Sequence, residues 1–315
     1  MQILHDGEGP VDSSIDGTAV TIGVFDGVHV GHQYVLRELR KEAAAKGLRS
    51  AVVTFDTHPA LVLRPENAPK LLNTLEQKLE LLEENGVDAT YVVHFDEARS
   101  RTEPDEFVRE VFVESLRARA LVVGEDFHFG RGRSGNVDRL RELGDRIGFE
   151  VRGLELIRHD PHAAEPVTST AVRRALAGGD VAAAAAMLGR PYEVRGTVQR
   201  GDERGRTIGF PTANIPVSKQ MAWPADAVYA GWYRRPDGAV HPCAINIGRR
   251  PTFYEHAQQS LLEAHLLDFE GDLYGEEARV TFIEFLRSEH RFSGIDALGA
   301  QLKKDIEHAR AILGV

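Results

Sequence analysis

The most regular hydrophobic pattern in the chain lies near its N-terminus, where two apolar runs flank a helical stripe. Residues 19–25 are mainly apolar and predict a buried strand, which ends at the polar break of residues 26–27. Helical spacing begins near Gly31 and stops at Gly47. A second apolar run, residues 51–55, follows. The order strand, helix, strand predicts two parallel strands joined by a right-handed crossover.

Strands and helices continue to alternate well past the middle of the chain. Apolar runs at 89–93 and 120–123 predict further strands. Apolar positions at spacings of three and four predict helices over 71–84, 104–116 and 137–148. This alternation predicts an α/β unit with a Rossmann-like open parallel sheet covered by helices. Ligands of such sheets bind beyond the carboxyl ends of the strands.

Near residue 188 the pattern changes to many short strands separated by turns. These strands are predicted at 192–199, 228–234, 243–247, 261–267 and 278–286. Such a series predicts a small closed β-barrel, and the amphipathic pattern over 295–309 predicts a helix that covers it. We expect a hinge at residues 189–191 and two domains, residues 1–187 and 188–315.

Charge and composition exclude several classes of protein. The 315 residues include 38 basic and 48 acidic side chains, a formal net charge of −10. This balance argues against an extended nucleic-acid surface but not against nucleotides, which need only a local positive site. The single cysteine, Cys243, cannot form an internal disulfide and indicates a reducing compartment. No apolar run reaches the roughly 18–20 residues that span a bilayer, and the N-terminus lacks a secretory signal pattern. We therefore expect a cytoplasmic protein without a membrane partner.

Two histidines stand where the first predicted strand gives way to the first helix. His29 and His32 belong to the string G-V-F-D-G-V-H-V-G-H. Unpaired backbone N–H groups and the positive end of the helix dipole favour anions there, and the glycines let a phosphate approach the backbone. An isolated H-x-x-H pair is equally often two surface histidines. Zinc is disfavoured because two ligands at this spacing do not complete a metal site.

Two further loops are expected at the same edge of the sheet. Residues 124–135, G-E-D-F-H-F-G-R-G-R-S-G, follow a predicted strand. In a merely solvated loop Phe127 and Phe129 would be exposed rings without a partner, and an aromatic ligand would supply one. Residues 168–170 precede a helix, so their hydroxyls either bind a ligand or cap that helix. Arg173, expected on its first turn, is suited to bidentate phosphate contacts.

A series of motifs, in the same order along the chain, carries a resemblance to a known family. The string around the histidines resembles the nucleotidyltransferase signature, in which both histidines hold ATP phosphates and stabilise the leaving pyrophosphate. With V-G-E-D-F-H-F-G (123–130) and S-T-A-V-R (169–173), the chain is similar to the bacterial bifunctional riboflavin kinase/FMN adenylyltransferase family, often called FAD synthetase. The riboflavin-kinase part is matched by G-R-T-I-G-F-P-T-A-N-I (205–215), N-I-G-R-R-P-T-F (246–253) and E-A-H-L-L-D-F-E-G-D-L-Y-G (263–275).

The resemblance covers about residues 18–313 and implies two reactions that use Mg²⁺. Riboflavin would be phosphorylated to FMN with ATP, and FMN would be adenylylated to FAD with a second ATP. It also implies a six-stranded, riboflavin-kinase-like barrel in which Thr212 and Asn214 hold Mg²⁺–ATP and Glu263 is the catalytic base. Without the resemblance, P-T-A-N is a turn into a strand and Glu263 an exposed strand-end carboxylate.

The resemblance also assigns the remaining site residues. In adenylyl transfer His29, His32 and Arg173 would neutralise charge, and no general base is required because the FMN phosphate is already ionised. The ATP- and phosphate-binding residues are expected to be Gly23, Phe25, Asp26, Gly31, Ser169, Thr170, Gly201, Gly205 and Gly209. The flavin-binding residues are expected to be Asp126, Phe127 and Phe129.

Three positions depart from the family pattern: Thr57 replaces a proline, Ala227 a glycine and Thr168 a serine. Ala227 matters only if its backbone needs a positive φ. Two other function classes stay open. A cytidylyl- or NMN-type transferase is disfavoured by the intact G-F-P-T-A-N and Glu263, and a non-enzymatic flavin carrier by two separate phosphate-handling sets. The sequence leaves the oligomeric state open.

Overall fold

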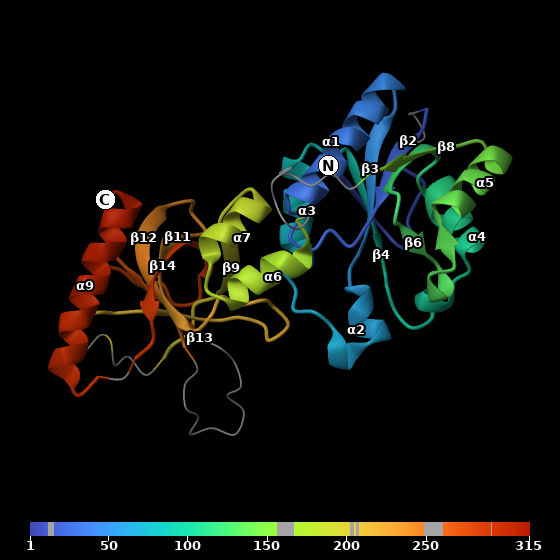
Figure 1. Ribbon diagram of the computed structural model, residues 1–315. Helices are drawn as coiled ribbons and strands as arrows, with labels where there is room; N and C mark the ends of the chain where they lie inside the picture. The colour runs from blue at the N-terminus through green and yellow to red at the C-terminus, as the bar shows by residue number, and fades with distance from the viewer. Residues whose placement is uncertain (12–15, 156–166, 202–204, 206–207, 249–260, 291) are drawn as a thin grey trace. The chain divides into compact units, whose positions relative to one another are not determined.

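The chain folds into two compact units, Met1–Thr168 and Ser169–Val315. The computed structural model describes residues 1–11, 16–155, 167–201, 205, 208–248, 261–290 and 292–315 (Figure 1). Both units carry the architecture expected from the sequence: a parallel α/β sheet in the first, and an antiparallel barrel with a helix in the second.

The first unit is built on six parallel strands in the order β1-β4-β3-β2-β5-β8. Their bounds are β1 (Gln2–His5), β2 (Thr18–Ile22), β3 (Arg49–Phe55), β4 (Ala89–Val93), β5 (Ala118–Gly124) and β8 (Glu150–Leu154). Successive residues of a strand point to opposite faces, so the sheet has two hydrophobic cores. Ala19 and Val52 belong to one core, and Val20 and Val53 to the other.

Helices cover both cores. α1 (Val30–Ala45) and α3 (Leu75–Glu84) contribute to the core of Ala19, whereas α4 (Pro104–Phe107), the π-helical segment Val108–Ser115 and α5 (Val137–Ile147) contribute to that of Val20. The remaining pieces of the unit are short: α2 (Pro59–Leu63), the 3₁₀ turns Pro65–Asn67, Arg99–Arg101 and Arg131–Arg133, and the two-residue strands β6 (His128–Phe129) and β7 (Gly135–Asn136).

Three details differ from the sequence prediction. α3 begins at Leu75 rather than at residue 71, because Thr74 and Gln77 form a capping box. The predicted helix over 104–116 continues from α4 as a π-helix. The edge strands β1 and β8 were not predicted, because they are only 4 and 5 residues long and carry polar side chains that interrupt the apolar pattern.

The second unit contains six antiparallel strands in the order β10-β13-β12-β11-β14-β9. Their bounds are β9 (Tyr192–Thr197), β10 (Ala213–Pro216), β11 (Ala227–Arg234), β12 (Val240–Gly248), β13 (Leu261–Leu266) and β14 (Glu277–Ser288). The Gln199 N–H donates to the Asn214 carbonyl over 2.8 Å. This bond links the residues after β9 to β10, the two edges of the sheet, and nearly closes the barrel. α9 (Ile295–Leu313) packs against β11, β12 and β14, as predicted. Ala227 has no positive φ, so its replacement of glycine strains nothing.

Two helices that precede the barrel pack with it. α7 (Val181–Leu188) lies against β9 and β14, and the Ala225 N–H donates over 2.9 Å to the Leu176 carbonyl of α6 (Ser169–Ala177). The division into compact units therefore falls at residues 168/169. The expected functional boundary at residues 187/188 stays a prediction.

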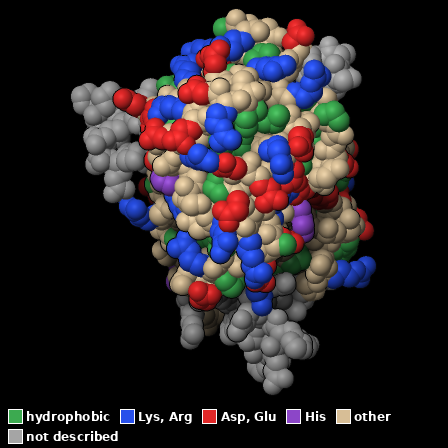
Figure 2. Space-filling view, turned by 90° about the vertical axis from the view of Figure 1, so that its right-hand side faces the viewer, with side chains coloured by type: hydrophobic (Ala, Val, Ile, Leu, Met, Phe, Trp, Pro, Cys, Tyr) green, Lys and Arg blue, Asp and Glu red, His purple; other side chains and the backbone are tan. Residues whose placement is uncertain are grey.

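One face of the molecule carries charged side chains of both signs. On the face shown in Figure 2, basic and acidic groups alternate without a broad area of one sign.

Candidate active sites

The order of the parallel strands creates a switch point between β2 and β5. From β2 the chain moves outward to β3 and β4 on one side, and later to β5 and β8 on the other. The loops that follow adjacent strands leave in opposite directions at such a point, and ligands bind between them. The G-x-F-D-G-x-H-x-G-H turn follows β2, and the 124–135 loop follows β5.

His29 and His32 form a stacked pair at the N-terminus of α1. His29 is the N-cap residue, and its Nδ1 accepts a hydrogen bond from the His32 N–H over 3.4 Å. The two ring centroids are 3.7 Å apart, with an angle of 18° between the ring planes. A Cβ on Gly31 would lie only 3.1 Å from the His29 ring, so glycine gives that ring its place beside the helix backbone.

The His32 ring presents a buried nitrogen without a partner. Within the described part of the chain, its Nδ1 makes no hydrogen bond. Burial lowers the pKa of His32 well below its usual value, and the nearby His29 and Lys78 lower it further. A neutral imidazole at pH 7 carries one N–H donor and one acceptor nitrogen. Since buried polar atoms are normally hydrogen-bonded, this nitrogen marks a place for a ligand.

The turn between β2 and α1 is backbone-strained and firmly anchored. Phe25 and Val28 have φ angles of 50° and 39°, which non-glycine residues rarely adopt. The Asp26 carboxylate accepts the Leu72 N–H over 2.8 Å, and the Asn73 side chain accepts the Gly27 N–H. Asp26 is buried, with 4% of its surface exposed, and its hydrogen bond to Leu72 holds the turn in place.

The glycine at the start of this turn is also constrained. The Gly23 N–H donates to the Val53 carbonyl over 3.1 Å, and a Cβ there would lie 3.1 Å from the Phe25 ring. The Phe25 ring in turn is tilted against His32, with 5.0 Å between ring centroids. The structure thus brings together Gly23, Phe25, Asp26, Gly31 and both histidines.

Sequence reasoning missed a lysine beside this turn. Lys78 of α3 is 7% exposed, and its ammonium donates to Thr54 Oγ1 over 3.3 Å and to the Phe55 carbonyl over 3.0 Å. Burial lowers the pKa of Lys78 to about 8, although nearby Asp26 and Asp56 raise it. The signal was present in the sequence, because Lys78 falls on the apolar stripe of residues 75, 79 and 82.

The loop after β5 carries the predicted flavin-binding residues. The rings of Phe127 and Phe129 are stacked, with centroids 5.5 Å apart and planes 5° apart. Phe129 is 7% exposed and packs against Phe107, so its ring already has a partner within the protein. Asp126 is exposed. Flavin binding by these residues stays a prediction, with Phe127 the more accessible ring.

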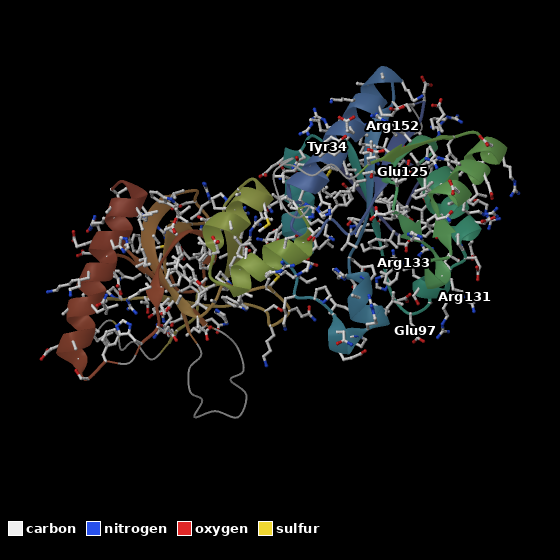
Figure 3. The ribbon with its side chains drawn as sticks, in the orientation of Figure 1. Tyr34, Glu97, Glu125, Arg131, Arg133 and Arg152 are labelled. Carbon is white, nitrogen blue, oxygen red and sulfur yellow. The ribbon has the colours of Figure 1, made fainter. Side chains whose placement is uncertain are left out.

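The same loop also carries charged side chains. Arg131 and Arg133, which Figure 3 labels, are exposed in the turn between β6 and β7. Glu125 accepts from Arg141 over 2.9 Å, and Arg131 lies 3.1 Å from Glu103.

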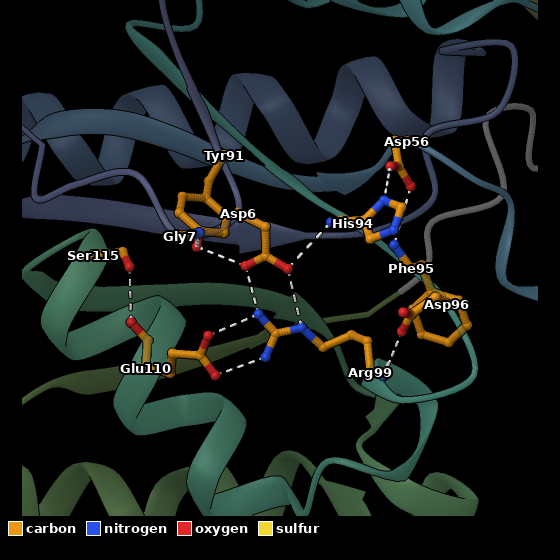
Figure 4. Close-up of polar contacts among 10 residues, drawn as sticks. All are labelled: Asp6, Gly7, Asp56, Tyr91, His94, Phe95, Asp96, Arg99, Glu110 and Ser115. Atoms are coloured by element: carbon orange, nitrogen blue, oxygen red, sulfur yellow. Dashed lines mark hydrogen bonds and ion pairs between the residues drawn. The ribbon is translucent and has the colours of Figure 1, made fainter.

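A polar network ties together the carboxyl ends of three strands (Figure 4). The Arg99 guanidinium donates to Asp6, which follows β1, with 3.2 Å between Nε and Oδ2. It also donates to Glu110 of the π-helical segment over 2.7 Å. The Asp56 carboxylate, after β3, accepts the Phe95 N–H over 3.0 Å and lies 2.6 Å from His94 Nδ1, after β4. Burial opposes ionisation of Asp56, but these two contacts leave its pKa lowered, and Asp56 raises that of His94. The network fixes the sheet edge beside the turn.

The other predicted phosphate ligands lie in the second unit. Ser169 and Thr170 are the first two residues of α6, so the helix starts earlier than expected. Arg173 is its fifth residue and therefore lies on the second turn rather than the first. The approach of these three residues to the histidines stays a prediction.

Strand register in the barrel brings the predicted kinase residues together. β10 and β13 pair Asn214 with Glu263, and β12 and β13 pair Asn246 with Glu263. Asn214 is 7% exposed, and its Oδ1 has no hydrogen-bond partner in the described structure. A Cβ on Gly201 would lie 2.4 Å from the Asn214 amide, so a larger residue there would displace this amide.

Beside these residues is a cavity of about 550 Å³. Gly205, Thr212 and Asn214 line it, together with Arg200, whose guanidinium lies 5.0 Å from the centroid of the Tyr274 ring. Gly209 is exposed, with a φ of 83°. Residues 206–207 and 249–253 of the kinase motifs lie outside the described residues.

The two units define a two-domain enzyme that handles nucleotide phosphates. One has a switch-point site at a helix N-terminus, and the other has a barrel cavity with an unpaired amide oxygen. Residues 11–171 match the FAD synthetase family, and residues 188–313 match the riboflavin kinase family. The chain belongs to the bifunctional riboflavin kinase/FMN adenylyltransferase family.

Named relatives cover nearly the whole chain. Bifunctional riboflavin kinase/FMN adenylyltransferases of Haemophilus influenzae and Escherichia coli K12 are 40% and 39% identical, and cover 94% and 95% of this chain and 94% of each relative. A crystal structure described as a macrolide-efflux protein from Streptococcus pneumoniae matches with a TM-score of 0.86 and 27% identity, over 98% of this chain and 99% of that one. Among the described residues, no helix of this chain is both long and apolar enough to cross a membrane.

Proposed function

We propose that FMN is adenylylated at the His29–His32 turn and that the barrel phosphorylates riboflavin at the Asn214–Glu263 pair. The observation that carries the first assignment is the stacked histidine pair with its unpartnered nitrogen at a helix N-terminus. Together the two reactions convert riboflavin to FMN and then to FAD, in line with the two families that match the chain.

In the adenylyl step an FMN phosphate oxygen attacks the α-phosphorus of ATP, and pyrophosphate leaves. Negative charge develops on the leaving pyrophosphate oxygen as its bond to the α-phosphorus breaks. Preorganised hydrogen-bond donors that face this charge accelerate the step. The N–H groups at the start of α1 and the imidazoles of His29 and His32 are such donors. We assign charge neutralisation to Arg173 and nucleotide contacts to Ser169 and Thr170. Asp126, Phe127 and Phe129 are assigned to the flavin.

In the kinase step Glu263 takes the proton from the terminal ribityl hydroxyl as its oxygen attacks the γ-phosphorus of ATP. The Gly201–Gly209 loop supplies backbone N–H groups to the phosphates. The Asn214 Oδ1 and the Thr212 hydroxyl fit Mg²⁺, which prefers oxygen ligands and keeps several waters. When bound, Mg²⁺ neutralises phosphate charge.

We further propose a cytoplasmic enzyme with small-molecule partners only: ATP, riboflavin and FMN. The single cysteine, which is buried in β12, supports a reducing compartment. The boundary at residues 187/188 is proposed as the functional one, because the riboflavin kinase match starts at residue 188.

The test is incubation with riboflavin, ATP and Mg²⁺, followed by separation of the flavins. We expect FMN and FAD, with ADP from one step and pyrophosphate from the other. The double variant His29→Ala/His32→Ala should lose FAD formation by at least ~10²-fold, a typical loss for one oxyanion donor, while FMN formation continues. Equal loss of both activities would refute separate sites.

A further inference from the structure

Lys78 is a buried charge that no step above uses. Its ammonium donates to Thr54 Oγ1 and to the Phe55 carbonyl, at the last two residues of β3. A buried ammonium is unfavourable unless it is paired and hydrogen-bonded, and a side chain of similar length without charge would pack there more easily. Packing alone therefore does not explain why a charged residue occupies this position.

The contacts of Lys78 lead to the histidine pair. The Thr54 hydroxyl that accepts from Lys78 donates to the Val24 carbonyl over 3.2 Å. Val24 directly precedes Phe25, the strained residue whose ring lies against His32. Lys78, Thr54 and Val24 thus form a continuous line of contacts to Phe25 and His32.

We propose that Lys78 is a positioning residue for adenylyl transfer, whose ammonium acts through Thr54 to hold the Val24–Phe25 turn that places the His32 ring at the N-terminus of α1. The inference rests on the proposed role of His32. It adds a residue from α3, an element outside the H-x-G-H turn, to the catalytic apparatus.

Electrostatics around Lys78 support this role. The groups that face it are Asp26 from the turn, Asp56 from the end of β3 and His32 from α1. The two carboxylates favour the ammonium, which in turn disfavours a second positive charge on His32. His32 therefore enters the reaction as a neutral donor of fixed orientation.

The experiment compares Lys78→Met, Thr54→Val and their combination in the full-length protein. The matched control is Lys41→Met, since Lys41 lies exposed on α1 beside Glu38. We expect kcat for FAD formation from FMN and ATP to fall ~10–100-fold in Lys78→Met, as for a misplaced catalytic group, while KM for both substrates changes less than about 3-fold. Thr54→Val should show a smaller loss, and the combination no more than Lys78→Met alone, because both act along one line.

A pH profile separates positioning from packing. The wild-type kcat for FAD formation should fall above pH ~8, as Lys78 loses its proton, and Lys78→Met should lack this limb. Unchanged kcat in Lys78→Met, or a raised KM for ATP at constant kcat, would overturn the proposal. If Lys78→Met loses riboflavin phosphorylation too, Thr54→Val decides, and an unimpaired Thr54→Val refutes it. A wild type that makes no FAD refutes the proposed function instead.

Discussion

Replacing Lys78 by methionine should make the stability of the first unit less dependent on pH. Burial lowers the pKa of this ammonium from its ordinary 10.5 to about 8. One pKa unit corresponds to about 1.4 kcal/mol, so the charged form costs the native state about 3 kcal/mol relative to an exposed lysine. Methionine removes this penalty but also two hydrogen bonds from a charged donor, each worth about 1.5 kcal/mol or slightly more. These contributions nearly cancel, so at pH 7 we expect the stability of Lys78→Met to equal that of the wild type or lie slightly below it.

The sign of the pH dependence follows from proton binding. Between pH ~8 and ~10.5 the unfolded chain binds more protons at residue 78 than the folded chain does. The wild-type free energy of unfolding therefore rises with pH across this window, by about 3 kcal/mol from this group. Lys78→Met lacks the contribution, and the other titrating groups cancel when the two proteins are compared at each pH.

The assay is urea denaturation at pH 7, 8, 9 and 10 with two probes. Far-UV circular dichroism reports both units, whereas tryptophan fluorescence reports the second, because Trp223 and Trp232, the two tryptophans of the chain, lie in it. The difference between the variants should grow with pH in the circular-dichroism transition and stay near zero in fluorescence. A difference that does not vary with pH would refute the buried-charge reasoning, as would a loss of several kcal/mol at pH 7.

Two further outcomes are expected. Glu263→Gln keeps the shape of the side chain but cannot take a proton, so FMN formation should fall ~10²–10⁴-fold while FMN-to-FAD conversion stays near wild type. Separate assays of the two half-reactions check this, and normal FMN formation would contradict the role of Glu263 as the base. The segment 169–315 should phosphorylate riboflavin and show a higher Tm than 188–315. The shorter segment lacks α6 and nearly all of α7, whose buried Val172, Leu176, Val181 and Ala184 cover apolar surface. Calorimetry of both segments decides, and equal Tm values would refute the packing argument.

The sequence by itself determined the two architectures and the chemistry of the turn. Continuous apolar runs that alternate with helical stripes predicted a parallel sheet in the first half, and clustered short strands predicted the barrel. The string G-x-F-D-G-x-H-x-G-H placed both histidines at a helix N-terminus, where α1 indeed begins at Val30. These features are local, because each depends on neighbouring residues along the chain.

Only the tertiary structure decided which distant residues meet. Lys78 lies 46 positions after His32, and only the packing of α3 beside β3 brings its ammonium to Thr54. The register of β10, β12 and β13 set Asn214, Glu263 and Asn246 side by side, since a one-residue slip would have turned them to the other face. Burial of Phe129 and the packing of α7 with the barrel likewise arose from long-range contacts, whose partners the local pattern does not specify.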